Sequence, residues 1–179
     1  MRTTQSHRLT GLSLVELLTV MSIISIVTAF ATPSFVGLIQ KFRLMGEATA
    51  LSGALANARS EAIRQGVKVT VCVSTDGVNC ATGETNWLAG WMIYAAPIAA
   101  PTSIVKLRVQ NKWKSSDKLA ATGLTPISSV DFNRDGFLTG SGGNALAFQA
   151  DTVPPNPAAR HCVKLFLTGH REVTNGACS

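Results

Sequence analysis

One carboxylate stands out because it lies at the start of a long apolar stretch. Glu16 is followed by 24 residues without a charge, from Leu17 to Gln40. As a helix, these residues would be about 36 Å long, compared with about 30 Å for the hydrocarbon core of a bilayer. A charge at the edge of such a segment is costly, so it indicates a functional site.

The four cysteines are the other residues with distinctive chemistry. Cys72 and Cys80 enclose a turn-rich loop, and Cys162 and Cys178 enclose the last predicted strand pair. No C-x-x-C pair is present and few histidines are available, so we predict disulfides and no metal site. Of the three possible connectivities, the spacing favours the one with two local disulfides, Cys72–Cys80 and Cys162–Cys178, each worth about 2.5–3 kcal/mol on the loop-entropy model. Disulfides would place this part of the chain outside the cytoplasm.

Other residues give little indication of catalysis. The sequence has no H-E-x-x-H zinc motif, no G-x-x-x-x-G-K-[ST] phosphate loop and no G-x-S-x-G nucleophile turn. Asp131 to Gly136 begins like a calcium loop, but Gly142 stands where a bidentate Glu would be needed, so we predict a tight hairpin turn. We therefore expect a protein that is not an enzyme and has no cofactor.

Positive charge is in modest excess and is unevenly placed. The formal net charge is +6, and Arg2 and Arg8 in the N-terminal segment contribute to it. The remaining excess is weaker than that of a dedicated nucleic-acid-binding domain. Because lysines commonly protect an exposed sheet edge, we interpret one basic cluster as a solvated edge strand and loop. Its members are Lys106, Arg108, Lys112, Lys114 and Lys118.

The N-terminal elements must position Glu16. Met1 to Gly11 is polar, basic and free of acidic residues, which predicts a leader that stays in the cytoplasm. Residues 12–40 would then form the apolar, membrane-spanning half of a helix, in which Pro33 predicts a kink. An ordinary secretory signal, cleaved after the small residues near Ala31, is the alternative.

The helix is predicted to continue as an amphipathic segment over residues 41–65. Arg43 and Glu47 are expected to form an i,i+4 ion pair on a different face from the apolar one, and Gly66 is expected to end the helix. Together the two halves predict one helix of roughly 50 residues. The apolar face should pack against a sheet, and it comprises Leu44, Ala48, Leu51, Leu55, Ala58 and Ala62.

Residues 66–179 are predicted to form a β-rich globular domain. Short β-branched or apolar runs alternate with Gly, Pro, Asn and Asp turns, which favours an antiparallel sandwich or sheet pair. The predicted strands are Val67–Val73, Gly90–Ala95, Ile104–Gln110, Ile127–Phe132, Phe137–Thr139, Ala145–Gln149, Cys162–Leu167 and Glu172–Thr174.

The N-terminal residues carry a resemblance to a known family. Gly11, followed by Leu12-Ser13-Leu14-Val15-Glu16, resembles the class III signal of type IV prepilins and type II secretion pseudopilins. The resemblance implies that a prepilin peptidase cuts after Gly11 and methylates Leu12, although the family's usual first residue is Phe. It implies that Glu16 is the assembly carboxylate, which pairs with the N-terminus of a neighbouring subunit. Pro33 matches the family's helix-kinking proline.

The rest of the chain resembles one branch, the GspH/FimT family. That resemblance implies an α+β pilin-like fold, in which a long N-terminal helix packs on an antiparallel β-sheet or sandwich domain. The matching segments are Asn57–Ile63, Gly90-Trp91, Asp131–Gly136, Cys162 and Leu165–Gly169.

The resemblance also implies a function. The chain would be a FimT-like minor pilin that joins or primes a type IV pilus, with a possible part in DNA uptake. The alternatives are a GspH-type minor pseudopilin of a type II secretion system and a dedicated DNA-binding competence pilin. Partners would be other major and minor pilins or pseudopilins, the prepilin peptidase and the inner-membrane assembly platform. The chain would cross the bacterial inner membrane once, with a periplasmic C-terminal domain, before it enters the pilus or pseudopilus.

DNA contact would fall in the C-terminal segment. The FimT branch has a Gly-Arg-x-Arg loop between its last strands, and the matching stretch here is Gly169-His170-Arg171-Glu172. One Arg position holds His170 and the other holds Glu172, so this stretch departs from the motif. Phosphate contacts depend on positive charge. The candidate DNA contacts are Arg160, Lys164, His170 and Arg171.

Overall fold

The computed structural model describes residues 13–96, 104–122, 127–140 and 145–178, and the backbone alone for 30–34. The predicted cleavage residues Gly11 and Leu12 lie outside the described residues, as does the side chain of Pro33. The chain divides into two compact units, Met1–Gly37 and Leu38–Ser179. Within the described residues, no helical stretch has the length and apolar character needed to cross a membrane.

A single long helix, α1, runs from Leu14 to Gln65 and contains 52 residues. This confirms the predicted helix of roughly 50 residues. Gly66 ends it with a φ of +66°, a conformation that glycine adopts without steric cost, and its amide donates to the carbonyl of Ala62 at 2.9 Å. The predicted helix terminator is therefore confirmed.

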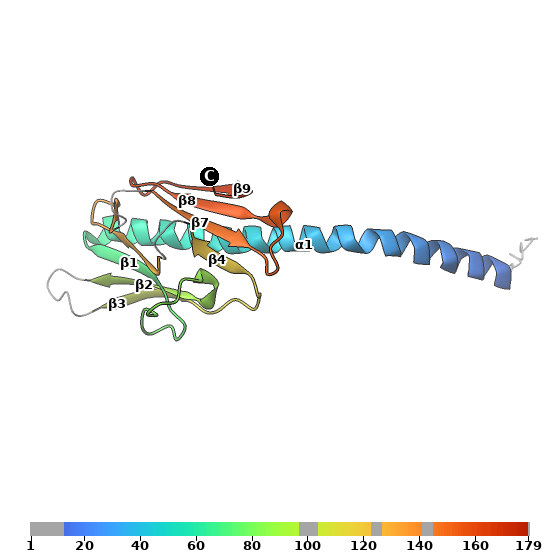
Figure 1. The fold of residues 1–179 in the computed structure, drawn as a ribbon. Helices are drawn as coiled ribbons and strands as arrows, with labels where there is room; N and C mark the ends of the chain where they lie inside the picture. The colour runs from blue at the N-terminus through green and yellow to red at the C-terminus, as the bar shows by residue number, and fades with distance from the viewer. Residues whose placement is uncertain (1–12, 97–103, 123–126, 141–144, 179) are drawn as a thin grey trace, which may run out of the picture. The chain divides into compact units, whose positions relative to one another are not determined.

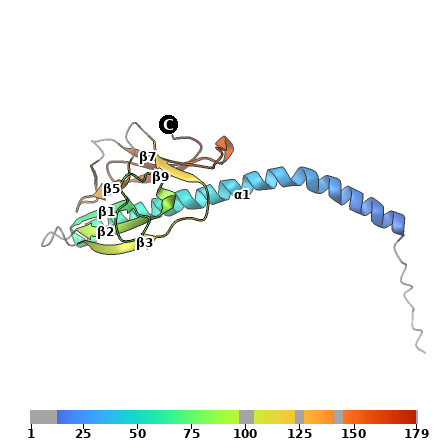
Figure 2. The ribbon, with the colours of Figure 1, turned by 60° about the horizontal axis from the view of Figure 1, so that its bottom comes forward.

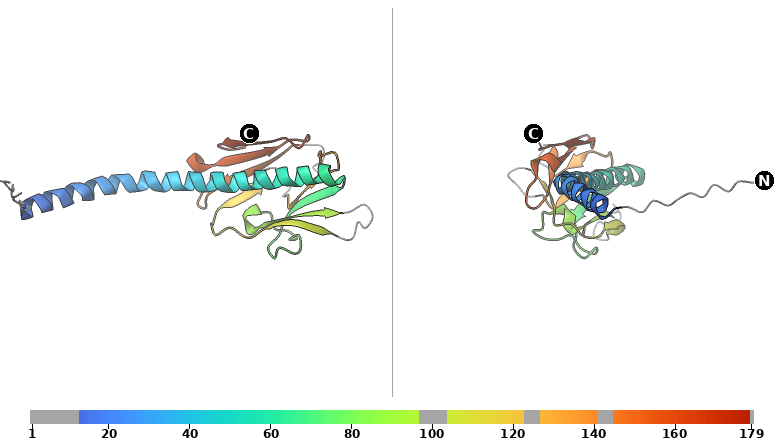
Figure 3. Two further views of the ribbon diagram at one scale, coloured as in Figure 1. Left: turned by 180° about the vertical axis from the view of Figure 1, so that it is seen from behind. Right: turned by 90° about the vertical axis from the view of Figure 1, so that its right-hand side faces the viewer.

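In the described part of the second unit, the rest of the chain forms two antiparallel sheets, two short 3₁₀ segments and the loops between them. Sheet A has the strand order β3-β2-β1-β5-β6, and sheet B has the order β4-β7-β8-β9. Seen from behind, the second half of α1 passes in front of both sheets (Figure 3). The bounds are β1 Lys68–Val73, η1 Trp87–Ala89, β2 Trp91–Ala96, β3 Val105–Gln110, β4 Lys118–Ala121, β5 Ser129–Phe132, β6 Leu138–Thr139, β7 Leu146–Asp151, η2 Pro157–Ala159, β8 His161–Leu165 and β9 Arg171–Asn175.

One core joins the second half of α1 to both sheets. Along the helix, all six residues of the predicted apolar face are buried, which confirms that face. They pack with Val71 and Phe132 of sheet A and with Phe148 and Leu165 of sheet B. Each buried Leu or Phe side chain contributes about 1.5–3 kcal/mol. Trp87 is buried in this core. Its ring meets the ring of Phe148 edge to face, with the two ring centroids 5.3 Å apart.

The strands agree with prediction except for one that sequence patterns missed. The eight predicted strands are present, with ends shifted by one or two residues, which is the usual uncertainty of strand and helix ends. Strand β4 was not among the predicted strands, because Lys118-Leu119-Ala120-Ala121 has one large apolar residue and no β-branched one. It forms a strand because it pairs with β7, with Leu119 opposite Ala150.

The predicted ion pair between Arg43 and Glu47 is wrong. Glu47 is fully buried, since it lies on the same helical face as Leu44 and Leu51. Arg43 instead forms a two-bond ion pair with Asp117, which follows strand β3 in the chain.

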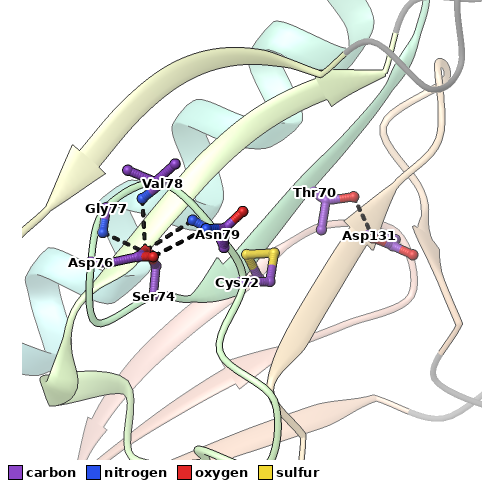
Figure 4. The surroundings of a disulfide bond; sticks show 9 residues. Thr70, Cys72, Ser74, Asp76, Gly77, Val78, Asn79 and Asp131 are labelled. Carbon is purple, nitrogen blue, oxygen red and sulfur yellow. Dashed lines mark hydrogen bonds between the residues drawn. A yellow bond between two sulfur atoms is a disulfide. The ribbon is translucent and has the colours of Figure 1, made fainter.

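Both disulfides are present in the local pairing that the sequence favoured. Cys72 is bonded to Cys80, and Cys162 to Cys178. Inside the first loop, Asp76 accepts hydrogen bonds from the backbone amides of Val78 and Asn79 at 2.8 and 2.9 Å (Figure 4). Because these amides stabilise the charged carboxylate, they hold the pKa of Asp76 well below its usual range. The hydrogen bond from the Asn79 amide has the larger effect, followed by that from Val78. The disulfide and this turn together tie the loop to β1, which contains Cys72.

Candidate functional site

Glu16 lies in the first turn of α1, with its side chain exposed. A carboxylate there interacts favourably with the partial positive charge of the helix N-terminus. Within the residues that the structure describes, Glu16 makes no ion pair. It therefore remains available to a cation from another molecule.

The helix around Glu16 exposes apolar side chains on every side. A helix that is apolar all round is typically buried in a larger assembly or in lipid, so this half of α1 has the character of a packing surface. Each of the following side chains is about half exposed or more: Leu14, Val15, Leu17, Leu18, Val20, Met21, Ile23, Ile24, Ile26 and Val27.

In the second unit, Arg59 brings together three segments that lie far apart in the sequence. Its Nε donates a hydrogen bond to the carbonyl of Gly136, at 3.1 Å, in the turn between β5 and β6. Gly169, in the turn between β8 and β9, is so close that an added Cβ would lie 2.6 Å from Arg59 Nε and 2.4 Å from the Gly136 carbonyl oxygen. Only glycine fits there, and its φ of +74° also favours glycine.

The two sheets are also joined directly at this point. The amide of Leu138 on β6 donates to the carbonyl of Leu167, just beyond β8, at 2.9 Å. Three of the segments that carried the sequence resemblance therefore meet: the end of α1, the turn after β5 and the turn after β8. Around them lie exposed apolar side chains, Ile63, Phe137, Phe166 and Leu167.

A charged cluster joins the segment after β3 to α1, in which Asp117 and Glu47 are buried and Arg43 is exposed. Arg43 donates to Asp117 from Nε at 2.5 Å and from Nη2 at 2.8 Å, and this bonding raises the pKa of Arg43. Glu47 accepts a 2.6 Å hydrogen bond from the Ser115 hydroxyl through Oε1, whereas its Oε2 has no partner. Burial raises the pKa of Glu47, and the nearby charge of Asp117 adds to the effect.

Sequence reasoning did not find this cluster. Arg43 and Asp117 are 74 residues apart, so no local pattern connects them. Spacing contained a usable signal, because Glu47 lies three residues after Leu44 and four before Leu51, within the apolar face. A carboxylate in such a position predicts a buried partner.

The structure does not gather the four candidate DNA contacts into one cationic surface. Arg160 forms an ion pair with Asp151 at 2.6 Å. Lys164 lies opposite Glu172 in the strand register, and Arg171 lies opposite Leu165, so Lys164 and Arg171 belong to opposite faces of sheet B.

His170, the fourth candidate, stacks on Phe166 with ring centroids 5.7 Å apart. It thereby lines a cavity of about 490 Å³ together with Ala145, Leu167 and Thr168. The surroundings of this histidine are mainly apolar. DNA contact by these four residues stays a prediction.

A family model described as "Type II transport protein GspH" matches residues 47–169. That range includes Arg59, the buried Glu47, and the segments Asp131–Gly136 and Leu165–Gly169 that carried the sequence resemblance. No curated protein sequence matches the chain.

Solved structures with a similar fold include a type IV minor pilin and a minor pseudopilin of a type 2 secretion system. The type IV minor pilin FimU of Pseudomonas aeruginosa PAO1 is 18% identical with a TM-score of 0.57, over 74% of this chain and 88% of FimU. A second crystal form of FimU is 17% identical with a TM-score of 0.55, over 73% of this chain and 91% of FimU. The minor pseudopilin EpsH from the type 2 secretion system of Vibrio cholerae is 13% identical with a TM-score of 0.50, over 72% of this chain and 94% of EpsH. At these identities the likeness shows the fold, and it confirms the predicted α+β pilin-like architecture.

Proposed function

We propose that this chain, which belongs to the family of the type II transport protein GspH, is a FimT-like minor subunit that joins or primes a type IV pilus. Family membership makes it a minor pilin or pseudopilin, and the choice of the type IV pilus is the proposal. The observation that carries a structural role is Glu16, a carboxylate with no ion pair among the described residues, on a helix whose described apolar side chains are exposed on every side. Such a helix needs neighbours to cover it.

Processing would prepare this helix for assembly. Cleavage after Gly11 would make Leu12 the N-terminal residue and place its new ammonium group one helical turn before Glu16. Within a bundle of such helices, the ammonium of one subunit can pair with the Glu16 carboxylate of the next. Leaving either charge unpaired in an apolar bundle would cost several kcal/mol, so the pair would set the register between subunits.

The proposed location follows from the same residues. Before assembly, residues 12–40 would lie in the inner membrane with the N-terminus in the cytoplasm, and the second unit would lie in the periplasm. Both disulfides in the second unit support an oxidising compartment. The proposed partners are other pilins, the prepilin peptidase and the inner-membrane assembly platform.

A single preparation tests processing. We would express the full chain in its own host, purify it from membranes and from sheared fibres, and determine the mature N-terminus by mass spectrometry. We expect methylated Leu12 in both fractions. An N-terminus at Thr32, or complete absence from sheared fibres, would contradict the proposal.

A pseudopilin of a type II secretion system remains the second candidate, because EpsH shares the fold at a TM-score of 0.50. Deletion of the gene separates the two functions. Loss of surface pili with normal secretion of exoproteins supports the pilus, whereas loss of secretion with normal pili supports the secretion system.

A further inference from the structure

A small cleft opens between the second half of α1 and the edge of sheet A. It has a volume of about 230 Å³ and is lined by residues of α1, β2 and β3. Trp91 of β2 forms part of the lining and is almost completely buried. Figure 2 shows β1, β2 and β3 side by side along this half of the helix. The lining residues are Ala50, Gly53, Ala54, Trp91, Arg108 and Gln110.

The cleft exists because the helix has small residues where it passes the edge strand. Gly53 is exposed, and a Cβ added there would meet no atom within 4 Å. Glycine in a helix interior costs about 0.5–1 kcal/mol relative to alanine, so its presence here has no evident benefit for the stability of the helix. What the missing side chain of Gly53 provides is the open space of the cleft beside it.

Arg108 gives the cleft a positive charge. In the register of β2 and β3, Arg108 lies opposite Ile93 and Gln110 lies opposite Trp91. Residues that face each other across two strands lie on the same side of the sheet, and Ile93 and Trp91 belong to the core beneath α1. Arg108 and Gln110 therefore lie on the helix side of sheet A.

Arg108 has no acidic partner in the described part of the domain. Lys106, Lys112 and Lys114 also form no ion pair among the described residues. The nearest acidic residue along the chain, Asp117, is buried and bonded to Arg43. A guanidinium with no ion pair among the described residues thus stands at a cleft that is lined by Trp91, Gln110 and small helix residues.

We propose that this cleft binds an acidic side chain from a neighbouring subunit of the fibre, with its carboxylate on Arg108. This rests on the proposed function. A guanidinium binds a carboxylate through two parallel hydrogen bonds, while Trp91 and the helix alanines suit the methylenes of an Asp or Glu. The cleft is smaller than the roughly 300–1,000 Å³ of sites for small molecules, which favours a single side chain.

The chain provides a matched control on the same strand. Lys106 carries the same charge two residues away, but it lies opposite Tyr94, beyond a register shift between Ile93 and Tyr94. It therefore belongs to the other face of the sheet. Arg108→Glu and Lys106→Glu change the net charge equally, and only the first changes the cleft.

The experiment measures incorporation of the full chain into sheared fibres, relative to its membrane pool, for wild type, Arg108→Glu, Lys106→Glu and Gly53→Leu. Gly53→Leu fills the cleft without changing charge. We expect Arg108→Glu and Gly53→Leu to reduce incorporation by about tenfold, as for loss of a well-placed charge pair, and Lys106→Glu to leave it unchanged. Thermal unfolding of each variant verifies that the second unit remains folded.

Three outcomes would overturn the inference. Equal losses in Arg108→Glu and Lys106→Glu, with Gly53→Leu unaffected, would assign the effect to the overall positive charge, as expected for a nucleic acid. Normal incorporation of Arg108→Glu would exclude the carboxylate contact while leaving the proposed function intact. Absence of the wild-type chain from the fibre would instead reject the proposed function.

Discussion

The two halves of α1 are one continuous helix with opposite relations to the rest of the chain. From Leu38 onward, one face is covered by two sheets, and Leu44, Leu51 and Leu55 are buried there. Before Gly37, the described apolar side chains are exposed. The second half is stabilised within its own chain, whereas the first half has apolar surface that its own unit does not cover. The difference indicates that the second half folds with its own domain, whereas the proposed function assigns the first half to assembly.

Glu16 and Glu47 express the same difference. Glu16 is exposed and has no ion pair among the described residues, whereas Glu47 is fully buried and accepts a hydrogen bond from Ser115. One carboxylate is available to another molecule, and the other belongs to the interior of the domain. Substitution at each position should therefore affect a different property.

The largest expected effect concerns Glu16. In Glu16→Gln, the charge that would pair with a neighbour's N-terminus is lost, and breaking a buried pair costs about 3–5 kcal/mol. We expect incorporation into sheared fibres to fall by about 100-fold or more, with thermal unfolding of the second unit unchanged. Immunoblots of sheared fibres and calorimetry measure the two properties. Normal incorporation of Glu16→Gln would remove the assembly role from this half of the helix.

The next effect concerns apolar residues in the two halves. Leu51→Ala leaves a cavity beneath both sheets and should destabilise the second unit by about 2–5 kcal/mol. Ile24→Ala, in the exposed half, should leave that stability unchanged. Denaturant unfolding of the full chain in detergent, followed by tryptophan fluorescence, measures both. A similar loss in Ile24→Ala would mean that the two halves unfold together.

Sequence patterns predicted the elements of the fold better than the contacts between them. The helix, its apolar face and its end at Gly66 follow from local spacing, and the disulfide pairs follow from short separations. The Arg43–Asp117 pair and the Arg59–Gly136 contact join residues more than 70 positions apart. Those contacts depend on how the sheets pack on the helix, which local propensity does not determine. Strand β4 was missed for the same reason, because only pairing with β7 makes it a strand.

The role of Glu16 and the processing site were predicted from a resemblance and from charge placement. Gly11 and Leu12 lie outside the described residues, so cleavage stays a prediction. By contrast, the cleft beside Arg108 could not have been predicted. It depends on how strands β2 and β3 pair beside Gly53 of α1, which local sequence patterns do not determine.

A smaller effect distinguishes Glu47 by its pH dependence. Because burial raises the pKa of Glu47 in the folded state, its contribution to stability is fully present at low pH and is lost as pH rises through that raised pKa. Glu47→Gln keeps an acceptor for Ser115 without a charge, so it should stabilise the second unit at pH 7 by on the order of 1 kcal/mol. The advantage should shrink below about pH 4.3, the ordinary pKa of Glu. Urea unfolding of wild type and Glu47→Gln at pH 4 and pH 7 measures the difference in their free energies of unfolding. An equal difference at both pH values would contradict a buried charge at Glu47.

The smallest effect compares one glycine from each half of the helix. Gly53→Ala adds a Cβ that meets no neighbouring atom and lowers the entropy of the unfolded chain, so it should stabilise the second unit by about 0.5–1 kcal/mol. Gly37→Ala also has open space, but Gly37 belongs to the first unit. Its substitution should leave the unfolding midpoint of the second unit unchanged. Differential scanning calorimetry of the two variants locates the boundary of cooperative folding, and equal stabilisation by both would extend that boundary into the first half of α1.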